Sequence, residues 1–137
     1  MKIFFDTNVY VAEALLGGPA EQMIAATIAA RWRMYSRSHL LEEAERVLVE
    51  KLGLSTRLGR LTTLRIRRRS TFVNLPASRH EVSSDPADSP ILQAALTAGV
   101  DFLVTNDKHL LELNPYESLR IISMTDYFEL LGTQKVL

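Results

Sequence analysis

Four carboxylate residues stand where an α/β protein would place its functional groups. Asp6 closes a short apolar run, and Asp107 comes two residues after the end of another. Glu43 and Asp88 fall in the first turns of two expected helices. If the four groups met, they would repel one another, and each would be driven towards protonation. A hard divalent cation with oxygen ligands, such as Mg²⁺, is the usual remedy, and it also takes up substrate phosphate.

Each carboxylate also has an ordinary structural explanation. Asp6 and Asp107 could favour the N-termini of the helices that follow them, and Asp85 with Asp88 makes a charged variant of a capping box. Glu43 lies in a run of acids that is typical of a solvated helix face. Taken singly, none of these residues indicates a function, and the sequence alone does not show that they meet.

Short apolar runs alternate with helical patterns along the chain, and this alternation must position the acids. Strands are expected at 2–5, 33–36, 71–75, 101–105 and 119–122. Helices are expected at 9–16, 20–32, 38–52, 56–69, 85–99, 107–113 and 125–131, with Asp85 and Pro86 beginning the fifth. The pattern predicts a parallel sheet covered by helices on both faces. Ligands of such sheets bind outside the carboxyl ends of the strands.

Composition narrows the class of protein further. The 137 residues are 47% apolar and 23% charged with no net charge, which excludes a disordered chain and predicts a single domain over residues 1–137. No apolar stretch is long enough to span a membrane, and Asp6 interrupts the N-terminus too early for a signal peptide. The absence of cysteine excludes disulfides and thiolate metal sites. We therefore expect a soluble, cytoplasmic protein.

Four short motifs occur in order along the chain. They are a strand followed by Asp-Thr-Asn-Val at 6–9, Ser-x-x-Leu-x-Glu at 38–43 with Val-Leu at 47–48, Asp-Pro-x-Asp-x-x-Ile at 85–91, and Asp-Phe-Leu-Val-Thr-Asn-Asp at 101–107. In this order and spacing the sequence resembles the PIN-domain family, from Lys2 to about Leu131. It is most similar to the small prokaryotic VapC-like toxins of toxin–antitoxin pairs. The resemblance implies a three-layer α/β/α sandwich with a mostly parallel central sheet, and a ribonuclease that depends on Mg²⁺ or Mn²⁺.

The resemblance also assigns roles to individual residues. It implies a catalytic quartet made of Asp6, Glu43, Asp88 and Asp107. The three aspartates of this quartet would hold a metal ion. Asn8 and Thr105 fall on polar positions that support the quartet. Glu43 is preferred to Glu42 because it precedes Val47-Leu48 at the family's spacing. A bound metal would polarise the scissile phosphate and lower the pKa of a water, while Glu43 would hold a second metal or orient that water as a base.

The charge distribution suggests how RNA would be held. Residues 1–80 carry 13 Lys or Arg against seven Asp or Glu, whereas residues 81–137 carry three against nine. Six arginines lie between 57 and 69. We expect Arg67, Arg68 and Arg69 to contact the RNA backbone, which gives affinity without sequence preference. A solvated helix face is the alternative explanation.

Partners other than RNA are less clearly indicated. An antitoxin protein is expected as a partner only because the resemblance to toxins of toxin–antitoxin pairs implies one. The apolar residues of the first two expected helices could form a homodimer surface or belong to the core: Val11, Leu15, Met23 and Ile24.

Three other functions fit part of the pattern. An aspartyl phosphatase or phosphotransferase usually has Asp-x-Asp after its first strand, but Asn8 stands at the third position here. A DNA-directed nuclease resembling the flap endonucleases would need additional DNA-binding elements. The main alternative is a PIN-like module without activity that binds RNA or a protein partner.

Overall fold

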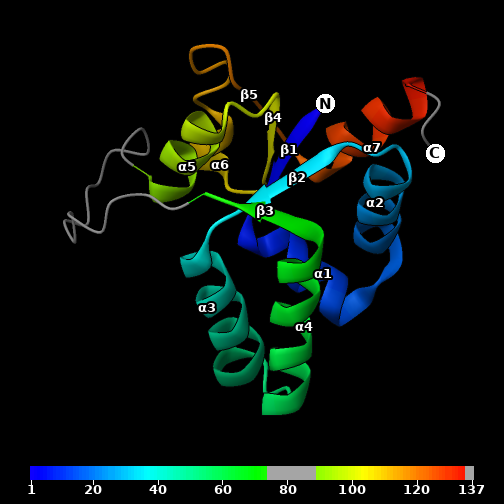
Figure 1. The fold of residues 1–137 in the computed structure, drawn as a ribbon, viewed down its shortest axis with the longest axis vertical. Coiled ribbons are helices and arrows are strands. Elements are labelled where there is room, and N and C mark those ends of the chain that lie inside the picture. The colour runs from blue at the N-terminus through cyan, green and yellow to red at the C-terminus, as the bar shows by residue number, and fades with distance from the viewer. Residues whose placement is uncertain (74–88, 135–137) are drawn as a thin grey trace.

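The computed structural model describes residues 1–73 and 89–134. Its described strands form one sheet in the order β3-β2-β1-β4-β5, and every neighbouring pair is parallel. The strands are β1 (Lys2–Phe5), β2 (Arg33–Ser36), β3 (Ser70–Phe72), β4 (Phe102–Val104) and β5 (Arg120–Ile122). The predicted parallel sheet is confirmed, and β1 lies at its centre (Figure 1).

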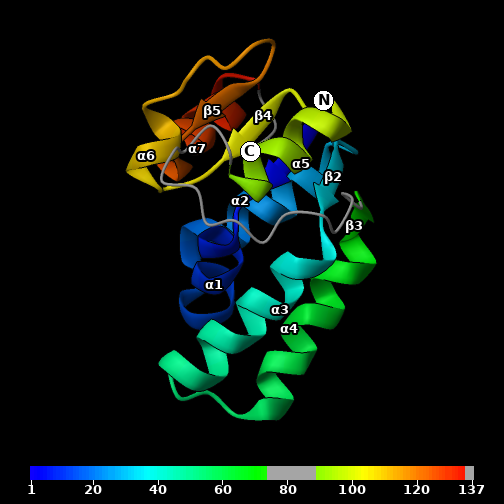
Figure 2. The same cartoon turned by 90° about the vertical axis from the view of Figure 1, so that its left-hand side faces the viewer.

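Helices cover both faces of this sheet (Figures 1 and 2). They are α1 (Thr7–Leu16), α2 (Gly18–Ala29), α3 (Ser38–Arg46) with a π-helical extension η1 (Val47–Lys51), α4 (Thr56–Arg69), α5 (Pro90–Ala98), α6 (Lys108–Leu111) and α7 (Met124–Thr133). The three-layer α/β/α architecture expected from the sequence is therefore confirmed. None of the described helices combines the length and the apolar character needed to cross a membrane.

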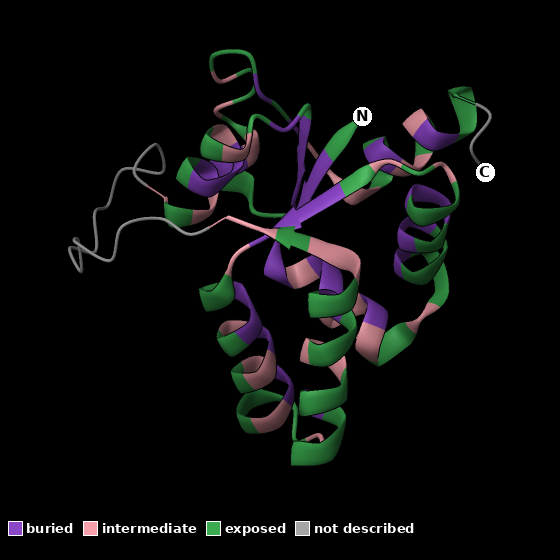
Figure 3. Ribbon diagram, in the orientation of Figure 1, coloured by how far each residue is buried: buried purple, intermediate pink, exposed green. Residues whose placement is uncertain are grey.

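Apolar residues of the central strands form the core because they are covered on both sides. All three apolar residues of β1, Ile3 to Phe5, are inaccessible to solvent, and β4 is buried throughout (Figure 3). Such continuous apolar runs are typical of strands buried on both faces of a parallel sheet. Tyr10 and Tyr127 pack edge-on against Phe5, with ring centroids 5.9 and 5.5 Å away. Met23 and Ile24 belong to this core, whereas Leu15 is exposed.

The start of α5 differs from the sequence prediction. The described helix begins at Pro90, and Ser89 at its N-cap position has an extended backbone with ψ of 128°. A helix that began at Asp85 would have to pass through Ser89, but proline disfavours helical backbone in the residue before it. The prediction of a start at Asp85-Pro86 is therefore wrong for this helix, and residues 85–88 lie outside the described part of the chain.

A helical hairpin made of α3, η1 and α4 projects from the sheet (Figure 1). Its two arms approach closely at Gly59, which is buried. A Cβ atom at this position would lie 2.7 Å from Val49 Cγ2 and 3.3 Å from Glu45 Cγ. Because glycine has no side chain, the backbone of α4 can pass directly over these two residues.

Gly59→Ala should therefore destabilise the hairpin, although alanine is the better helix former. The gain in helix propensity is about 1 kcal/mol, whereas overpacking a contact with a stiff β-branched side chain costs about 1–3 kcal/mol. We expect a net loss of about 1 kcal/mol in the free energy of unfolding, measured by urea denaturation. Gly132→Ala in α7 is the matched control, because a Cβ atom there would meet no described atom within 4 Å apart from the backbone of its own helix. A Gly59→Ala protein as stable as the Gly132→Ala protein would contradict this account.

Candidate functional site

The carboxyl ends of β1, β2 and β4 meet at one edge of the sheet, and the residues that follow them define the candidate site. The backbone N–H of Asp6 donates to the carbonyl of Val104 at 2.9 Å, which continues the pairing of β1 with β4. Thr105 follows β4, and Arg37 follows β2. The topology thus gathers at one edge residues that are far apart in sequence.

Asp6 is held at this edge by two hydrogen bonds. Its Oδ1 accepts from the backbone N–H of Thr7 at 2.6 Å, and its Oδ2 accepts from Thr105 Oγ1 at 2.7 Å. Asp6 also occupies the N-cap position of α1, so the capping explanation and a functional one describe the same side chain. Thr105 is fully buried, and its Oγ1 accepts from the N–H of Asp107 at 3.0 Å. Thr105 therefore links the two aspartates.

Glu43 joins the same network from the other side. Its Oε2 accepts a hydrogen bond from Thr7 Oγ1 at 3.3 Å, and its side chain is half-buried, whereas Glu42 is exposed. The hydrogen bonds thus run from Asp107 through Thr105, Asp6 and Thr7 to Glu43. The network therefore joins the carboxylates of Asp6 and Glu43, and it includes Asp107 through its backbone N–H.

The charges at this edge affect one another. Burial raises the pKa of Asp6, the hydrogen bonds from Thr105 and Thr7 lower it, and the carboxylates of Glu43 and Asp107 raise it again. The net direction is upward, because loss of water and like charges both disfavour the carboxylate form. A cation placed at this edge would relieve both effects.

The other aspartates of the sequence motifs lie in three places. Asp107 and Asp101 lie at opposite ends of β4, and Asp85 and Asp88 lie outside the described residues. Asp107 is exposed, and its Oδ1 caps α6 by accepting from the N–H of His109 at 2.9 Å. Asp101 lies at the opposite end of β4, where it accepts from the N–H of Lys2 at 2.8 Å, as expected for a structural residue.

The donor atoms at the edge fit a hard divalent cation in their chemistry. Asp6, Glu43 and Asp107 supply only oxygen, which Mg²⁺ and Mn²⁺ prefer. Asn8 adds a buried Oδ1 for which residues 1–73 and 89–134 provide no donor, and a buried acceptor of this kind fits a site completed by a water or an ion. Within the same residues, however, no three His, Cys, Asp or Glu side chains form a group that could hold a metal.

A family model described as the PIN domain matches residues 2–109, which is most of the chain. This chain belongs to the PIN-domain family. PIN domains are a nuclease-type family and typically use divalent metals. This agrees with the oxygen donors of Asp6, Glu43 and Asp107 at the carboxyl ends of the strands, a region that we call the acidic edge. Searches of curated proteins and of solved structures found no match.

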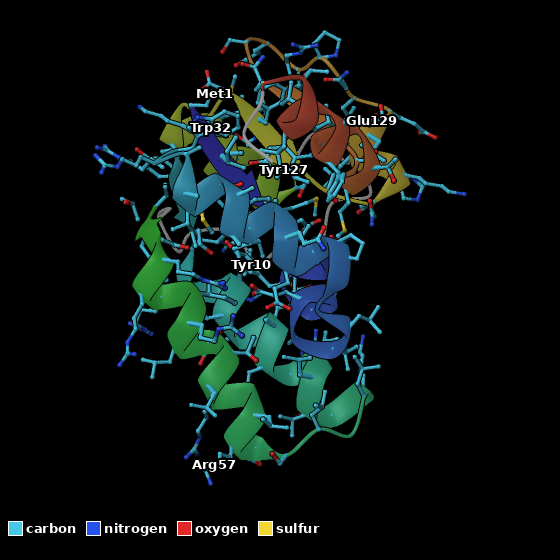
Figure 4. All side chains as sticks on the ribbon, turned by 90° about the vertical axis from the view of Figure 1, so that its right-hand side faces the viewer. Met1, Tyr10, Trp32, Arg57, Tyr127 and Glu129 are labelled. Atoms are coloured by element: carbon cyan, nitrogen blue, oxygen red, sulfur yellow. The ribbon has the colours of Figure 1, made fainter. Side chains whose placement is uncertain are left out.

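The backbone of the arginine-rich end of α4 lies in a different part of this PIN domain from Asp6, Glu43 and Asp107. Ser70 pairs with Met34 in the sheet, so Arg67 to Arg69 precede the amino end of β3, whereas the acids follow carboxyl ends of strands. Arg57 lies still further away, at the tip of the hairpin, while Tyr10 lies in the interior (Figure 4). Arg67 and Arg68 are exposed. Their contact with RNA stays a prediction.

Arg69 differs from its neighbours because its guanidinium is already engaged. Nη1 and Nη2 donate to the two carboxylate oxygens of Glu13 at 2.8 and 2.9 Å, and the group lies 5.9 Å from the centre of the Tyr10 ring. Arg65 approaches the same carboxylate at 3.6 Å. The Glu13 side chain is only 4% exposed. Sequence reasoning missed this ion pair, although Glu13 is the only charged residue of α1, and that was a signal that could have been used.

Proposed function

We propose that this PIN domain is an endoribonuclease that hydrolyses RNA phosphodiester bonds with the help of Mg²⁺ or Mn²⁺. The observation that carries the proposal is the hydrogen-bonded network around the buried Asp6 carboxylate, which runs through Thr7 to the Glu43 carboxylate and through Thr105 to the backbone N–H of Asp107. It gathers carboxylates at the edge of the sheet where α/β proteins bind ligands.

Each residue has a definite part in the proposed reaction. Asp6, Asp88 and Asp107 would hold the metal ion, which supplies charge to polarise the scissile phosphate and makes a water molecule more acidic. Thr105 fixes the Asp6 carboxylate and the backbone of Asp107 relative to each other. Glu43, oriented by Thr7, would direct the attacking water as a base or serve a second metal ion.

Glu43→Gln should lower the rate of RNA cleavage by about a hundredfold, because positioned acid–base groups typically contribute 10²–10⁴-fold. Glutamine can still accept the hydrogen bond from Thr7, so the fold should be retained. Glu42→Gln makes the same change one residue earlier, on an exposed side chain, and should leave the rate unchanged. Single-turnover cleavage of a labelled RNA measures both. Equal rates for the two variants would remove Glu43 from the mechanism.

The substrate class is tested with RNA and DNA strands of the same sequence, each incubated with Mg²⁺, Mn²⁺ or EDTA. Metal-dependent cleavage of the RNA alone supports the proposal. Cleavage of both strands would indicate a nuclease without preference for RNA. RNA binding without cleavage would favour the alternative of a PIN module that lacks activity.

The proposal extends to a toxin whose activity an antitoxin protein restrains. Its support is an apolar surface formed by the end of α1 and the hairpin, with exposed leucines at several positions: Leu15, Leu16, Leu52, Leu58, Leu61 and Leu64. A cavity of about 260 Å³ lies beneath it, lined mainly by leucines. Two of the exposed leucines, Leu58 and Leu61, line this cavity together with Ala14 of α1, and exposed apolar surface shared between elements is typical of protein interaction sites. A protein that is dimeric when purified alone would instead assign this surface to a homodimer.

A further inference from the structure

Arg37 is a cation close to the carboxylates of the candidate site. It directly follows β2, and the pairing of Phe4 with Tyr35 sets Arg37 level with Asp6 when the register is continued by two residues. Neighbouring strands are about 4.8 Å apart, so the Arg37 backbone lies close to that of Asp6. The exposed Arg33 occupies the other end of the same strand, away from the acids.

The guanidinium of Arg37 has no hydrogen-bond or ion-pair partner among the described residues, although Arg37 is only partly exposed to water. In residues 1–73 and 89–134 it makes no ion pair within 4.0 Å and no hydrogen bond, in contrast to the bidentate Arg69. Burial lowers the pKa of Arg37, and attraction to Glu43 raises it. Arginine stays protonated in proteins, so this is a permanent charge. A partly buried charge without a partner is costly unless an anion completes it.

We propose that Arg37 binds a backbone phosphate of the RNA substrate next to the scissile bond. This inference rests on the proposed ribonuclease function and identifies a substrate contact for it. A guanidinium matches the oxygens of a phosphodiester with two parallel hydrogen bonds. Its charge also offsets the repulsion that an RNA strand would meet on approaching Asp6, Glu43 and Asp107. The Arg67 guanidinium is placed differently, because it lies 5.7 Å from the centre of the Phe72 ring in the outer strand β3.

The inference is tested by measuring the binding of a labelled, mixed-sequence single-stranded RNA in Mg²⁺. The Asp6→Asn protein serves as the background, so that the RNA stays intact. Adding Arg37→Gln should raise Kd about tenfold, as expected for loss of a charged hydrogen-bonded contact. The slope of log K against log salt should become shallower by about 0.7, because one phosphate fewer is neutralised. Arg33→Gln is the matched control and should change neither value.

Two further measurements separate this inference from the function on which it rests. Arg37→Lys keeps the charge but not the paired hydrogen bonds, so it should give a Kd between those of the parent and of Arg37→Gln. Arg37→Gln with the same Kd and salt slope as Arg33→Gln would overturn the phosphate contact, even if the unmodified protein cleaves RNA. Conversely, if the unmodified protein cleaves nothing while Arg37→Gln alone weakens binding, the hydrolytic function fails and the phosphate contact stands.

Discussion

Asp6→Asn is expected to reduce metal-dependent RNA cleavage about a thousandfold or more. A metal ion contributes several kcal/mol to stabilising the transition state, and every 1.36 kcal/mol is a factor of ten in rate. Asparagine removes the negative charge and replaces one of the two carboxylate oxygens with an NH2 group, which cannot ligate a cation. Single-turnover cleavage in Mg²⁺ gives the rates. Full cleavage by this variant would exclude the proposed nuclease site.

The same variant should be as stable as the unmodified protein in the absence of metal, or more stable. Because the folded protein raises the pKa of Asp6, ionisation of this carboxyl costs stability, and that loss develops as the pH rises from below its ordinary value of 3.8. Above the raised pKa of the folded state the cost is fully present, and the neutral amide removes it. Below the ordinary pKa of 3.8 the advantage should disappear. Melting curves in EDTA at pH 7 and at acid pH measure the difference.

Other aspartates provide controls for the loss of activity. Asp88→Asn should share it, because Asp88 is proposed as a metal ligand. Asp101→Asn should retain cleavage, since Asp101 bonds the N–H of Lys2 at the opposite end of the sheet. Asp85→Asn should also retain it. Equal activity of the Asp88 and Asp85 variants would remove Asp88 from the site.

Arg69→Met should destabilise the protein by about 3 kcal/mol. Removing one partner of a buried ion pair costs about 3–5 kcal/mol, because the other charge stays buried without compensation. The remaining charge here is Glu13, with Arg65 at 3.6 Å as its only other ion-pair partner in the described residues. Arg65 should take up part of the charge, which places the cost at the lower end of that range. Urea denaturation measures the free energy of unfolding.

Two variants test whether this cost comes from the buried pair. Arg60→Met breaks the ion pair with Glu45, whose side chains are 77% and 37% exposed, and should cost at most about 1 kcal/mol. In the Glu13→Gln, Arg69→Met double variant no buried charge is left unpaired, because the side chain of Arg65, which loses its partner Glu13, is 56% exposed. Its loss of stability should therefore be smaller than the sum of the two single losses. Additive losses would mean that the two side chains stabilise the protein independently.

The sequence by itself determined the order of elements and the class of fold. Apolar runs such as Ile3–Phe5 are strands because they are short and continuous, and their alternation with helical patterns requires parallel connections. The rule that ligands bind at the carboxyl ends of such strands then marked Asp6 and Asp107. These conclusions depend on local periodicity and chain connectivity, which a single sequence contains.

Only the tertiary structure decided which side chains meet. Asp6 bonds Thr105 across 99 positions, and Glu13 binds Arg69 across 56. The spacing to Val47-Leu48 favoured Glu43 over Glu42, but only the packing of α3 shows that Glu43 accepts a hydrogen bond from Thr7. The arginine-rich segment predicted cations that contact RNA, but in the structure Arg69 forms an ion pair with Glu13. The arginine that lies at the acidic edge is Arg37. The direction and burial of a side chain follow from how distant elements pack, and local sequence periodicity does not encode that packing.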